Sequence, residues 1–242
     1  MNTSNSSLIV GSIEALVVQK NIKNLHLSVL PPNGLVRITA PIKTKEDVIR
    51  VFLASKLEWI KKRQQQYLSQ RRQTKRKYVS GETHYYLGRP YRLLVKNNAK
   101  QNKFYVKGKN TFILEVKPNT TILQKEKLVT QWYRAGLKRV LYELINKWQP
   151  KLKVTPAYWR IQRMKTKWGS CNPKTGRILI NLELIKKPYH CVEYVVVHEW
   201  LHLLESKHND HFIKLLNKYL PKWKQAKTEL NQFILTYEKW GR

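Results

Sequence analysis

Hydrophobic and polar residues alternate along much of the first half of the chain, in the two-residue rhythm of half-buried β-strands. The pattern predicts strands over residues 11–20, 25–30 and 35–40, and the Pro-Pro-Asn-Gly turn at 31–34 predicts a hairpin between the last two. A second strand-rich stretch, 80–117, has Gly and Asn turns between its strands. The strands predicted there cover residues 85–87, 91–95, 104–106 and 111–116.

A helix is predicted to begin at Thr44, a suitable N-cap, because apolar residues after it recur at helical spacing. This helix, about 44–77, runs into a basic segment, 61–77, with eight Lys or Arg residues and no acidic one. The segment has two interpretations, a polyanion-binding arm and a solvated helix end that leads into a linker. Tyr67 is the only aromatic residue of the segment, which favours the second interpretation. The apolar side of the helix is predicted to hold Val48, Phe52, Leu53, Leu57, Trp59 and Ile60.

In the second half of the chain, residues 120–149 have the pattern of a long amphipathic helix, which Pro150 is predicted to end. Two further strands are predicted over 158–165 and 178–184, where apolar residues alternate onto one face. The residues between them, 168–176, are rich in turn formers. We therefore expect a tight hairpin made of these two strands.

The following helix, 188–205, carries the H-E-x-x-H pattern at residues 198–202. Residues four apart lie one above the other on a helix, so His198 and His202 can bind one metal ion. Glu199 projects beside them, where it can take a proton from a water on that metal. The helix is apolar nearly all round, so these polar groups need partners. The alternative is two core histidines bonded to backbone carbonyls, with Glu199 in a salt bridge.

A third ligand would complete a tetrahedral site with one open position. His208 and His211 are the nearest candidates, and Glu205 is a weaker one. His208 lies six residues beyond His202, about 600° of rotation on a continuous helix, so the helix must end before it can turn back. Asn209 is then a good N-cap for the next helix, which would place His211 in the first turn of that helix.

The same histidine spacing occurs in the metzincin class of metalloproteases, which the chain does not match. In the metzincin pattern a glycine stands where this chain has Glu205, and a methionine turn follows downstream. The two methionines of the chain, Met1 and Met164, both precede the helix. The sequence therefore excludes a metzincin.

The net charge of the chain indicates a further class of binding partner. The 242 residues carry 47 Lys and Arg against 15 Asp and Glu, which gives a net charge of +32 and a pI near 10.2. The excess is +17 up to Lys117 and +15 after it, so it is spread over the whole chain. Such a charge favours polyanions, and we expect non-specific binding of nucleic acid through a basic surface.

Composition narrows the class of protein. Apolar residues make up 42%, which excludes wholesale disorder. Two cysteines, Cys171 and Cys191, make no disulfide scaffold at this length. The N-terminus lacks the basic start of a secretory signal, and the most apolar window, 191–204, is too short to span a membrane. We therefore expect a cytoplasmic protein with no membrane segment.

Residues 159–223 resemble the SprT/YgjP-like metallopeptidase family, a zincin group. The resemblance rests on several motifs in the same order: the Trp-Gly-Ser-Cys run at 168–171, Arg177-Ile178 and Asn181, the H-E-x-x-H helix, His208 to Phe212, and the Pro-x-Trp close at 221–223. The N-terminal half is similar to the family's usual layout more loosely. Two positions depart from the pattern: Lys167 where arginine is common, and Trp200 where an aliphatic residue is common.

The resemblance implies one zinc ion per chain, with His198, His202 and His208 as ligands and Glu199 as catalytic acid and base. Trp168, Gly169 and Ser170 are further candidates for the substrate side of the site. Their alternative interpretation is structural, with Trp168 in the core and Gly169 in a turn.

The fold class that follows is α+β. A strand-rich N-terminal region, 1–117, includes the basic helix, about 44–77. A zincin-like metallohydrolase domain, 118–242, packs a β-hairpin on the H-E-x-x-H helix.

The function that follows is a zinc-dependent hydrolase, first of all a metallopeptidase with a peptide or protein substrate. Two other interpretations stay open. One is a nucleic-acid-associated binding protein whose metal site is mainly structural, which would need a fourth protein ligand. The other is a zinc hydrolase that cleaves nucleotide phosphoanhydrides, since a chain of charge +32 would attract nucleotides.

Overall fold

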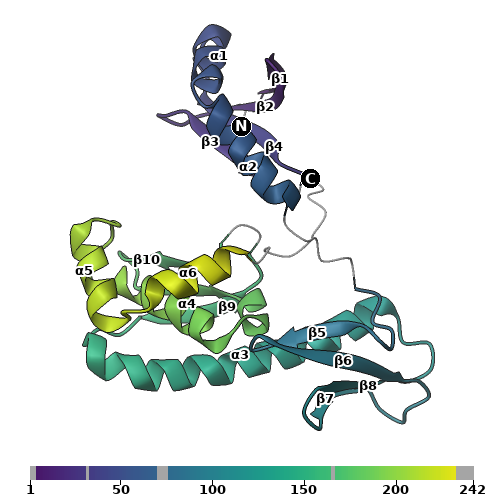
Figure 1. The fold of residues 1–242 in the computed structure, drawn as a ribbon. Coiled ribbons are helices and arrows are strands. Elements are labelled where there is room, and N and C mark those ends of the chain that lie inside the picture. The colour runs from purple at the N-terminus through teal and green to yellow at the C-terminus, as the bar shows by residue number, and fades with distance from the viewer. Residues whose placement is uncertain (1–3, 31–32, 70–75, 165–166, 233–242) are drawn as a thin grey trace. The chain divides into compact units, whose positions relative to one another are not determined.

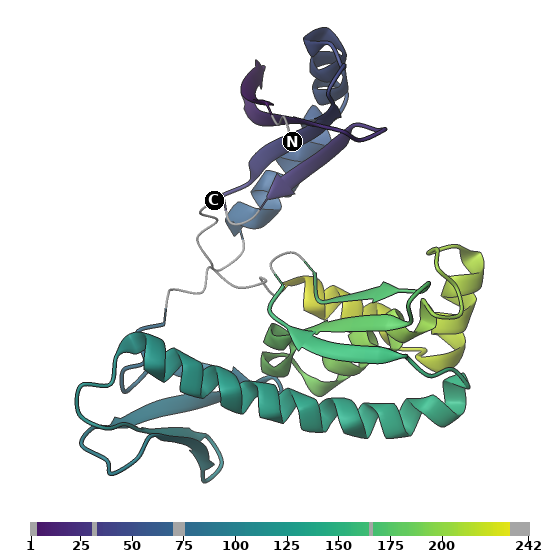
Figure 2. The ribbon, with the colours of Figure 1, turned by 180° about the vertical axis from the view of Figure 1, so that it is seen from behind.

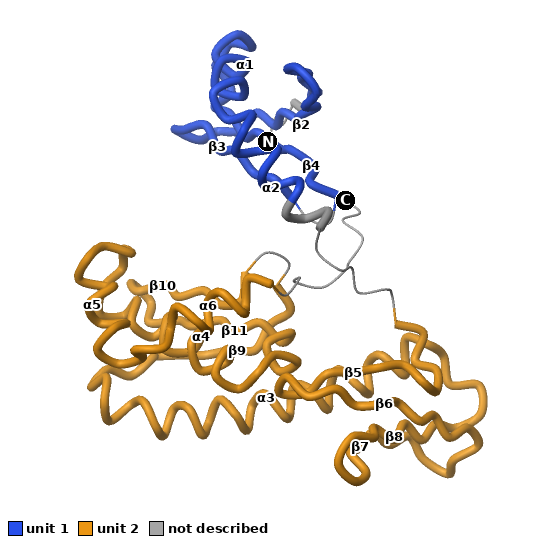
Figure 3. The backbone as a smooth tube through the Cα atoms, in the orientation of Figure 1, with its two compact units in different colours: residues 1–72 blue, residues 73–242 orange. Residues whose placement is uncertain are grey.

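The computed structural model describes residues 4–30, 33–69, 76–164 and 167–232 (Figure 1). The chain folds into two compact units, residues 1–72 and 73–242 (Figure 3). Each unit has its own cluster of buried hydrophobic residues.

The first unit contains a four-stranded sheet with the order β1-β2-β4-β3. Its inner pair, β2 with β4, is parallel, and both outer pairs are antiparallel. The three strands predicted here are present, and β3 and β4 form the predicted hairpin pair; residues 31–32 of its turn lie outside the described residues. The first strand was not predicted. The bounds are β1 Ser4–Val10, β2 Ile13–Lys20, β3 His26–Leu30 and β4 Leu35–Pro41.

Two helices follow this sheet, α1 (Glu46–Ala54) and α2 (Leu57–Ser69). The prediction of one helix from Thr44 to 77 is therefore wrong in two respects. The N-cap residue is Lys45, which makes no side-chain cap hydrogen bond. The helix is also interrupted after Ala54, and the second helix begins at Leu57. Residues 70–75 of the predicted helix and of the basic segment lie outside the described residues.

The buried face of these helices also differs from the predicted one. Ile49, Leu53 and Ile60 are buried, whereas the side chains of Val48 and Trp59 are about half exposed. Leu53 and Ile60 were predicted on the apolar side, whereas Ile49 takes the buried position that the prediction gave to its neighbour Val48.

The second unit begins with another four-stranded sheet, of order β5-β6-β8-β7. The long helix α3 (Ile122–Leu152) packs on it through an aromatic cluster in which Phe104 and Phe112 meet Trp132 and Tyr133. The predicted division at 117/118 falls inside this unit, because sheet and helix share one core. The strands are β5 Thr83–Tyr86, β6 Arg89–Lys96, β7 Lys103–Lys107 and β8 Thr111–Glu115.

The helix α3 has a capping box at its start, where the Thr121 side chain accepts a hydrogen bond from the Gln124 amide and the Gln124 side chain accepts one from the Thr121 amide. Pro150 does not end this helix, as the sequence pattern predicted, but lies in its last turn. The helix ends at Leu152 instead, and its C-cap residue, Lys153, has a left-handed backbone with φ of 53°.

A three-stranded sheet follows, with the order β10-β11-β9: β9 Tyr158–Gln162, β10 Gly169–Asn172 and β11 Arg177–Asn181. The predicted hairpin of 158–165 with 178–184 is wrong; residue 165 itself lies outside the described residues. The strand β9 runs parallel to β11, and the hairpin joins β10 to β11. The buried Asn181 explains the difference, because its amide donates to the carbonyls of Met164 and Lys167 and so fixes the crossover between β9 and β10.

The chain after β11 forms a short 3₁₀ helix, Leu182–Lys186, where the alternation of apolar residues predicted a longer strand. Three helices complete the unit: α4 (Tyr189–Leu201), α5 (Asp210–Tyr219) and α6 (Trp223–Gln232). The hairpin β10–β11 lies against α4 (Figure 2), so a hairpin does pack on the motif helix, although its first strand is not the one predicted. The α+β fold class, strand-rich in its N-terminal half, is confirmed. No helix among the described residues is both long and apolar enough to span a bilayer.

Candidate metal centre

Three histidines from the end of α4 and the loop after it lie together. One ring nitrogen from each of His198, His202 and His208 lies within 4.8 Å of the other two. The Nε2 atoms of His198 and His208 are 3.0 Å apart. The structure thus brings together the histidine pair of the motif and the nearer candidate for third ligand.

The loop geometry explains why His208 reaches the pair. The helix α4 ends at Leu201, so the chain turns back before His208, as its position in the sequence required. Asn209 is the N-cap of α5, as predicted, and its side chain accepts a hydrogen bond from the Phe212 amide at 3.0 Å. His211 is 61% exposed and faces Glu205 at 3.5 Å, so it is not part of the group.

Phe212 packs against all three imidazoles. Its ring centroid lies 5.1, 4.7 and 4.8 Å from those of His198, His202 and His208. The side chain is fully buried in the core of the second unit. No role was predicted for this residue, although Asn209, which places it, was predicted as a cap.

The protonation of the histidines suits metal binding. Burial, with the charges that His202 and His208 can carry, lowers the pKa of His198 to about 3, so its ring is neutral. The Nδ1 atom of His198 is buried and has no hydrogen-bond partner within the described parts of the chain. His202 donates from Nδ1 to the Glu205 carbonyl at 3.1 Å, which leaves the lone pair of its Nε2 available.

Glu199 is buried beside this group, with 8% of its surface exposed. Burial raises the pKa of its carboxyl to about 7, against the opposing effects of the Lys167 charge and a hydrogen bond from the Cys171 amide. A carboxyl group with such a pKa can exchange a proton near neutral pH, which is what a general base requires.

Gly169, on strand β10, leaves the space that Glu199 occupies. A Cβ atom built on this glycine would lie 2.5 Å from the Glu199 Cγ and 2.7 Å from its Oε1. Gly169 was predicted to lie on the substrate side or in a turn, and this contact was missed. A glycine that precedes a strand pattern can indicate such a close approach, but nothing in the sequence names the partner.

The other residues of the Trp-Gly-Ser-Cys run surround the same strand. Trp168 is half-buried against the core of the second unit, and the Lys187 ammonium lies 5.5 Å from its ring centroid. Ser170 is half-buried and alternates with Gly169, so it faces the other side of the strand. Burial and the Glu199 charge raise the pKa of the Cys171 thiol to about 11, so it stays protonated.

Trp223, the last residue of the Pro-x-Trp run at 221–223, also contacts this centre, through Tyr194. The Trp223 ring stacks on Tyr194 at 6.3 Å between centroids, and Tyr194 meets the His198 ring edge to face at 5.6 Å. Tyr194 lies one helical turn before His198 on α4. The start of α6 thus supports the metal-centre face of α4.

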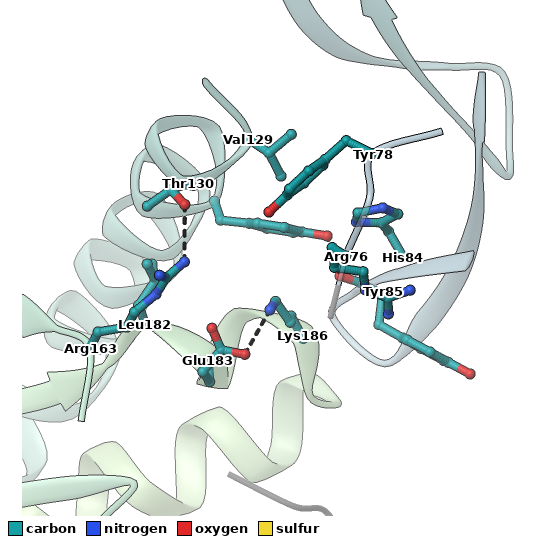
Figure 4. A pocket seen from close by; sticks show the side chains of 11 residues that line it. Arg76, Tyr78, His84, Tyr85, Val129, Thr130, Arg163, Leu182, Glu183 and Lys186 are labelled. Carbon is teal, nitrogen blue, oxygen red and sulfur yellow. Dashed lines mark hydrogen bonds and ion pairs between the residues drawn. The ribbon is translucent and has the colours of Figure 1, made fainter. Parts of the chain in front are cut away.

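A cavity elsewhere in the second unit does not include the histidine group (Figure 4). Lys186 and Glu183 form an ion pair of 2.6 Å at its wall, and Arg163 donates to Thr130 at 3.1 Å. His84 also lines this cavity and is buried. The chemistry of the motif helix is therefore separate from this cavity.

Comparison with known proteins gives a family match and two partial structural ones. The model of the YgjP-like metallopeptidase domain matches residues 23–233. The metallopeptidase zymogens abylysin of Pyrococcus abyssi and jannalysin of Methanocaldococcus jannaschii are each 20% identical to this chain, with a TM-score of 0.34. Those matches cover 37% and 38% of this chain and 90% and 87% of theirs. No curated protein matches the sequence.

Proposed function

The chain belongs to the YgjP-like metallopeptidase family, and on this premise we propose that it is a zinc-dependent peptidase. His198, His202 and His208 bind the zinc ion, and Glu199 is the general base. The observation that carries the proposal is the convergence of three ring nitrogens within 4.8 Å next to a buried carboxyl group on the same helix.

The residues of the centre fit zinc. Zinc prefers imidazole ligands in a tetrahedral arrangement, and catalytic sites keep the fourth position open. Among the described residues the group offers three side-chain donors. When bound, zinc polarises a carbonyl oxygen and lowers the pKa of a water molecule. A purely structural site would need a fourth protein ligand, so the donor count favours catalysis.

Glu199 supplies proton transfer in this proposal. Its carboxylate accepts the proton of the attacking water and then returns it to the amine of the leaving peptide fragment. The glycine at 169 leaves the carboxyl group its position, and the Cys171 amide orients it by a hydrogen bond.

Strand β10 is the substrate-binding edge in this proposal. It ends the three-stranded sheet of order β10-β11-β9, and Gly169 on it contacts Glu199. An extended peptide can pair with a free strand edge through backbone hydrogen bonds. A peptide bound along β10 would therefore bring a backbone carbonyl next to Glu199.

The rival hydrolase, specific for nucleotide phosphoanhydrides, and the nucleic-acid binding expected from the charge stay predictions. Both rest on the net charge of +32. A direct test of the second is the salt dependence of DNA binding, since phosphate neutralisation releases counterions.

One experiment separates these functions. Metal analysis of the purified chain is combined with hydrolysis assays on peptides, unfolded proteins and nucleoside triphosphates. We expect about one zinc ion at the histidine centre and hydrolysis of peptides only. The Glu199→Gln variant should keep the metal and lose hydrolysis by several orders of magnitude. Undiminished peptide hydrolysis by this variant would refute the assigned role of Glu199.

The ligand assignment has a matched pair of variants. His208→Ala should lower the zinc content of this centre, whereas His211→Ala should not, because His211 faces Glu205 in the structure. Retention of zinc in the first variant with loss in the second would show that the third ligand is His211.

A further inference from the structure

A second cluster of metal-ligating side chains lies at the other end of helix α4. His190 and Cys191 belong to its first turn, and Glu229 comes from α6, which packs on α4. One ligand atom from each of the three residues lies within 4.8 Å of the other two. The His190 Nε2 and Glu229 Oε2 atoms are 2.5 Å apart. None of the three belongs to the histidine centre described above.

The three side chains offer one nitrogen, one sulfur and one oxygen. Imidazole and thiolate are the ligands that zinc-class divalent ions prefer, and a carboxylate is a common third ligand for such ions. Calcium and magnesium prefer oxygen ligands only. The donor set therefore selects a zinc-class transition ion.

We propose that His190, Cys191 and Glu229 form a second binding site, for a zinc-class divalent ion that ties helix α6 to helix α4. The Cys191 thiol loses its proton to solvent as the sulfur–metal bond forms. The hydrogen bond between His190 and Glu229 opens to admit the ion between its two atoms, and Nε2 of His190 gives up to solvent the proton that it shares with Glu229, so that its lone pair can bind the ion.

The distances suit this exchange. Zinc–ligand bonds of about 2.0–2.3 Å place two ligands of a tetrahedral ion roughly 3.3–3.8 Å apart. The separations within the cluster bracket that range, from 2.5 Å for the ion pair to at most 4.8 Å for the group. The Cys191 thiol donates a long hydrogen bond of 3.7 Å to the Ala226 carbonyl, a weak contact that a sulfur–metal bond would replace.

Two of the three ligands are open to solvent and the third is buried, so the site has an entrance and a floor. The side chains of His190 and Glu229 are 56% and 38% exposed, so an ion can enter from solvent between them. Cys191 is fully buried and forms the floor of the site. The ion would thus rest on the surface of the α4–α6 contact.

Cobalt(II) provides the test, because it replaces zinc and reports its ligands. A thiolate ligand adds a sulfur-to-cobalt charge-transfer band in the near ultraviolet, which an all-histidine centre lacks. The full-length chain, freed of metal, is titrated with cobalt(II) and followed by absorbance and by metal analysis after desalting. We expect two ions per chain and the charge-transfer band with the second.

Four variants identify the site. His190→Gln alters an exposed residue, so its fold is retained, and it should bind one ion per chain without the band; Cys191→Ala should do the same. Cys171→Ala, which removes the other thiol, and His208→Ala, which alters the histidine centre, should both keep the band. The proposal is overturned if the parent chain shows no charge-transfer band at two equivalents of cobalt(II). It is also overturned if the band is absent in Cys171→Ala and present in Cys191→Ala.

Thermal unfolding gives an independent measurement. An ion that joins α4 to α6 should raise the melting temperature of the parent chain on the second equivalent of cobalt(II), by mass action on the folded state. The same equivalent should leave the melting temperature of His190→Gln unchanged. An equal rise in melting temperature in both proteins would refute the second metal site, and this result does not depend on whether the chain is a peptidase.

Discussion

The two four-stranded sheets of the protein have the same topology and different relations to the candidate centre. Orders β1-β2-β4-β3 and β5-β6-β8-β7 correspond strand for strand, with a parallel inner pair and antiparallel outer pairs in both. The first sheet is covered by α1 and α2 and has a core of its own. The second shares one core with α3, α4 and α5.

The difference shows which half of the molecule holds the metal centre in place. Buried residues of β8, α3, α4 and α5 belong to one continuous cluster, which includes Phe112, Leu137, Val197 and Phe212. A cavity in this cluster lowers the stability of the unit that holds the histidines, because a packed core relaxes only partly around a lost side chain. The core of the first unit contains no residue of the centre.

The largest expected effect comes from removing one core side chain in each sheet. Phe112→Ala should destabilise the second unit by about 3–5 kcal/mol and lower its melting temperature by about 10 °C, with peptidase activity lost over the same temperatures. Ile38→Ala, equally buried in the first unit, should unfold that unit at lower temperature and leave activity unchanged. Calorimetry with a parallel activity assay measures both. Equal loss of activity in the two variants would refute the separation of the units.

Two glycines, Gly169 in the site and Gly11 in the first unit, extend the same comparison. Gly169→Ala places a methyl group 2.5 Å from the Glu199 Cγ, so the carboxyl group must move, which should lower kcat by about 10²-fold. In Gly11→Ala, in the first unit, the new methyl group meets no atom within 4 Å. The control should cost about 1 kcal/mol of stability, because φ of Gly11 is 58°, and no activity.

The matched readout is kcat with zinc content determined in both variants. If Gly169→Ala retains full kcat and full zinc, Glu199 does not need the position that it has in the structure.

Local features were predictable from the sequence where one short pattern decides them. The His-Glu pair on a helix, the cap at Asn209 and the strands from 85 to 116 each depend on spacing within about ten residues. The topology of the sheets was not predictable in this way, because strand partners depend on distant contacts. The repeated order of the two sheets is likewise a property of pairing, not of similar residues.

The errors have specific physical causes. The hairpin was misplaced because the alternating residues of 158–162 and 178–181 are also what a parallel pair requires. The side-chain amide of Asn181, which holds the crossover, gives no periodic signal. The roles of Gly169 and Phe212 at the centre are three-dimensional contacts that no spacing along the chain encodes, so the sequence could not identify their partners.

A smaller effect is expected at Phe212, which packs on the histidines without binding metal. Phe212→Leu keeps an apolar side chain but removes the flat ring against three imidazoles, so zinc affinity should fall by about tenfold. Leu216→Met, on the same buried side of α5, is the matched control and should keep the affinity. Competition with a chelator measures both variants. Unchanged affinity in Phe212→Leu would mean that backbone geometry alone positions the rings.

The smallest effect contrasts the histidines of the two sheets, His84 in β5 and His26 in β3. Burial and the charges of Arg76 and Lys186, which line the same cavity (Figure 4), lower the pKa of His84 to about 4. A hydrogen bond of 3.2 Å that Glu82 accepts from His84 opposes this shift. The unfolded chain, with a histidine pKa of about 6.5, therefore binds the proton first as the pH falls. The stability due to neutral His84 is complete above about pH 6.5 and is lost as the pH falls towards 4.

The expected slope for this one proton is at most about 1.4 kcal/mol per pH unit within that window. His84→Gln removes the titratable imidazole, so the stability of the second unit should depend on pH less steeply than in the parent chain. His26→Gln, at an exposed position of the first unit, should leave the slope of the second unit unchanged, because it alters no residue of that unit. Denaturant unfolding at several pH values, with the metal content held equal, measures the slopes. The same slope in His84→Gln and the parent would mean that His84 binds its proton over the same pH range in the folded and unfolded chains, so that burial does not lower its pKa.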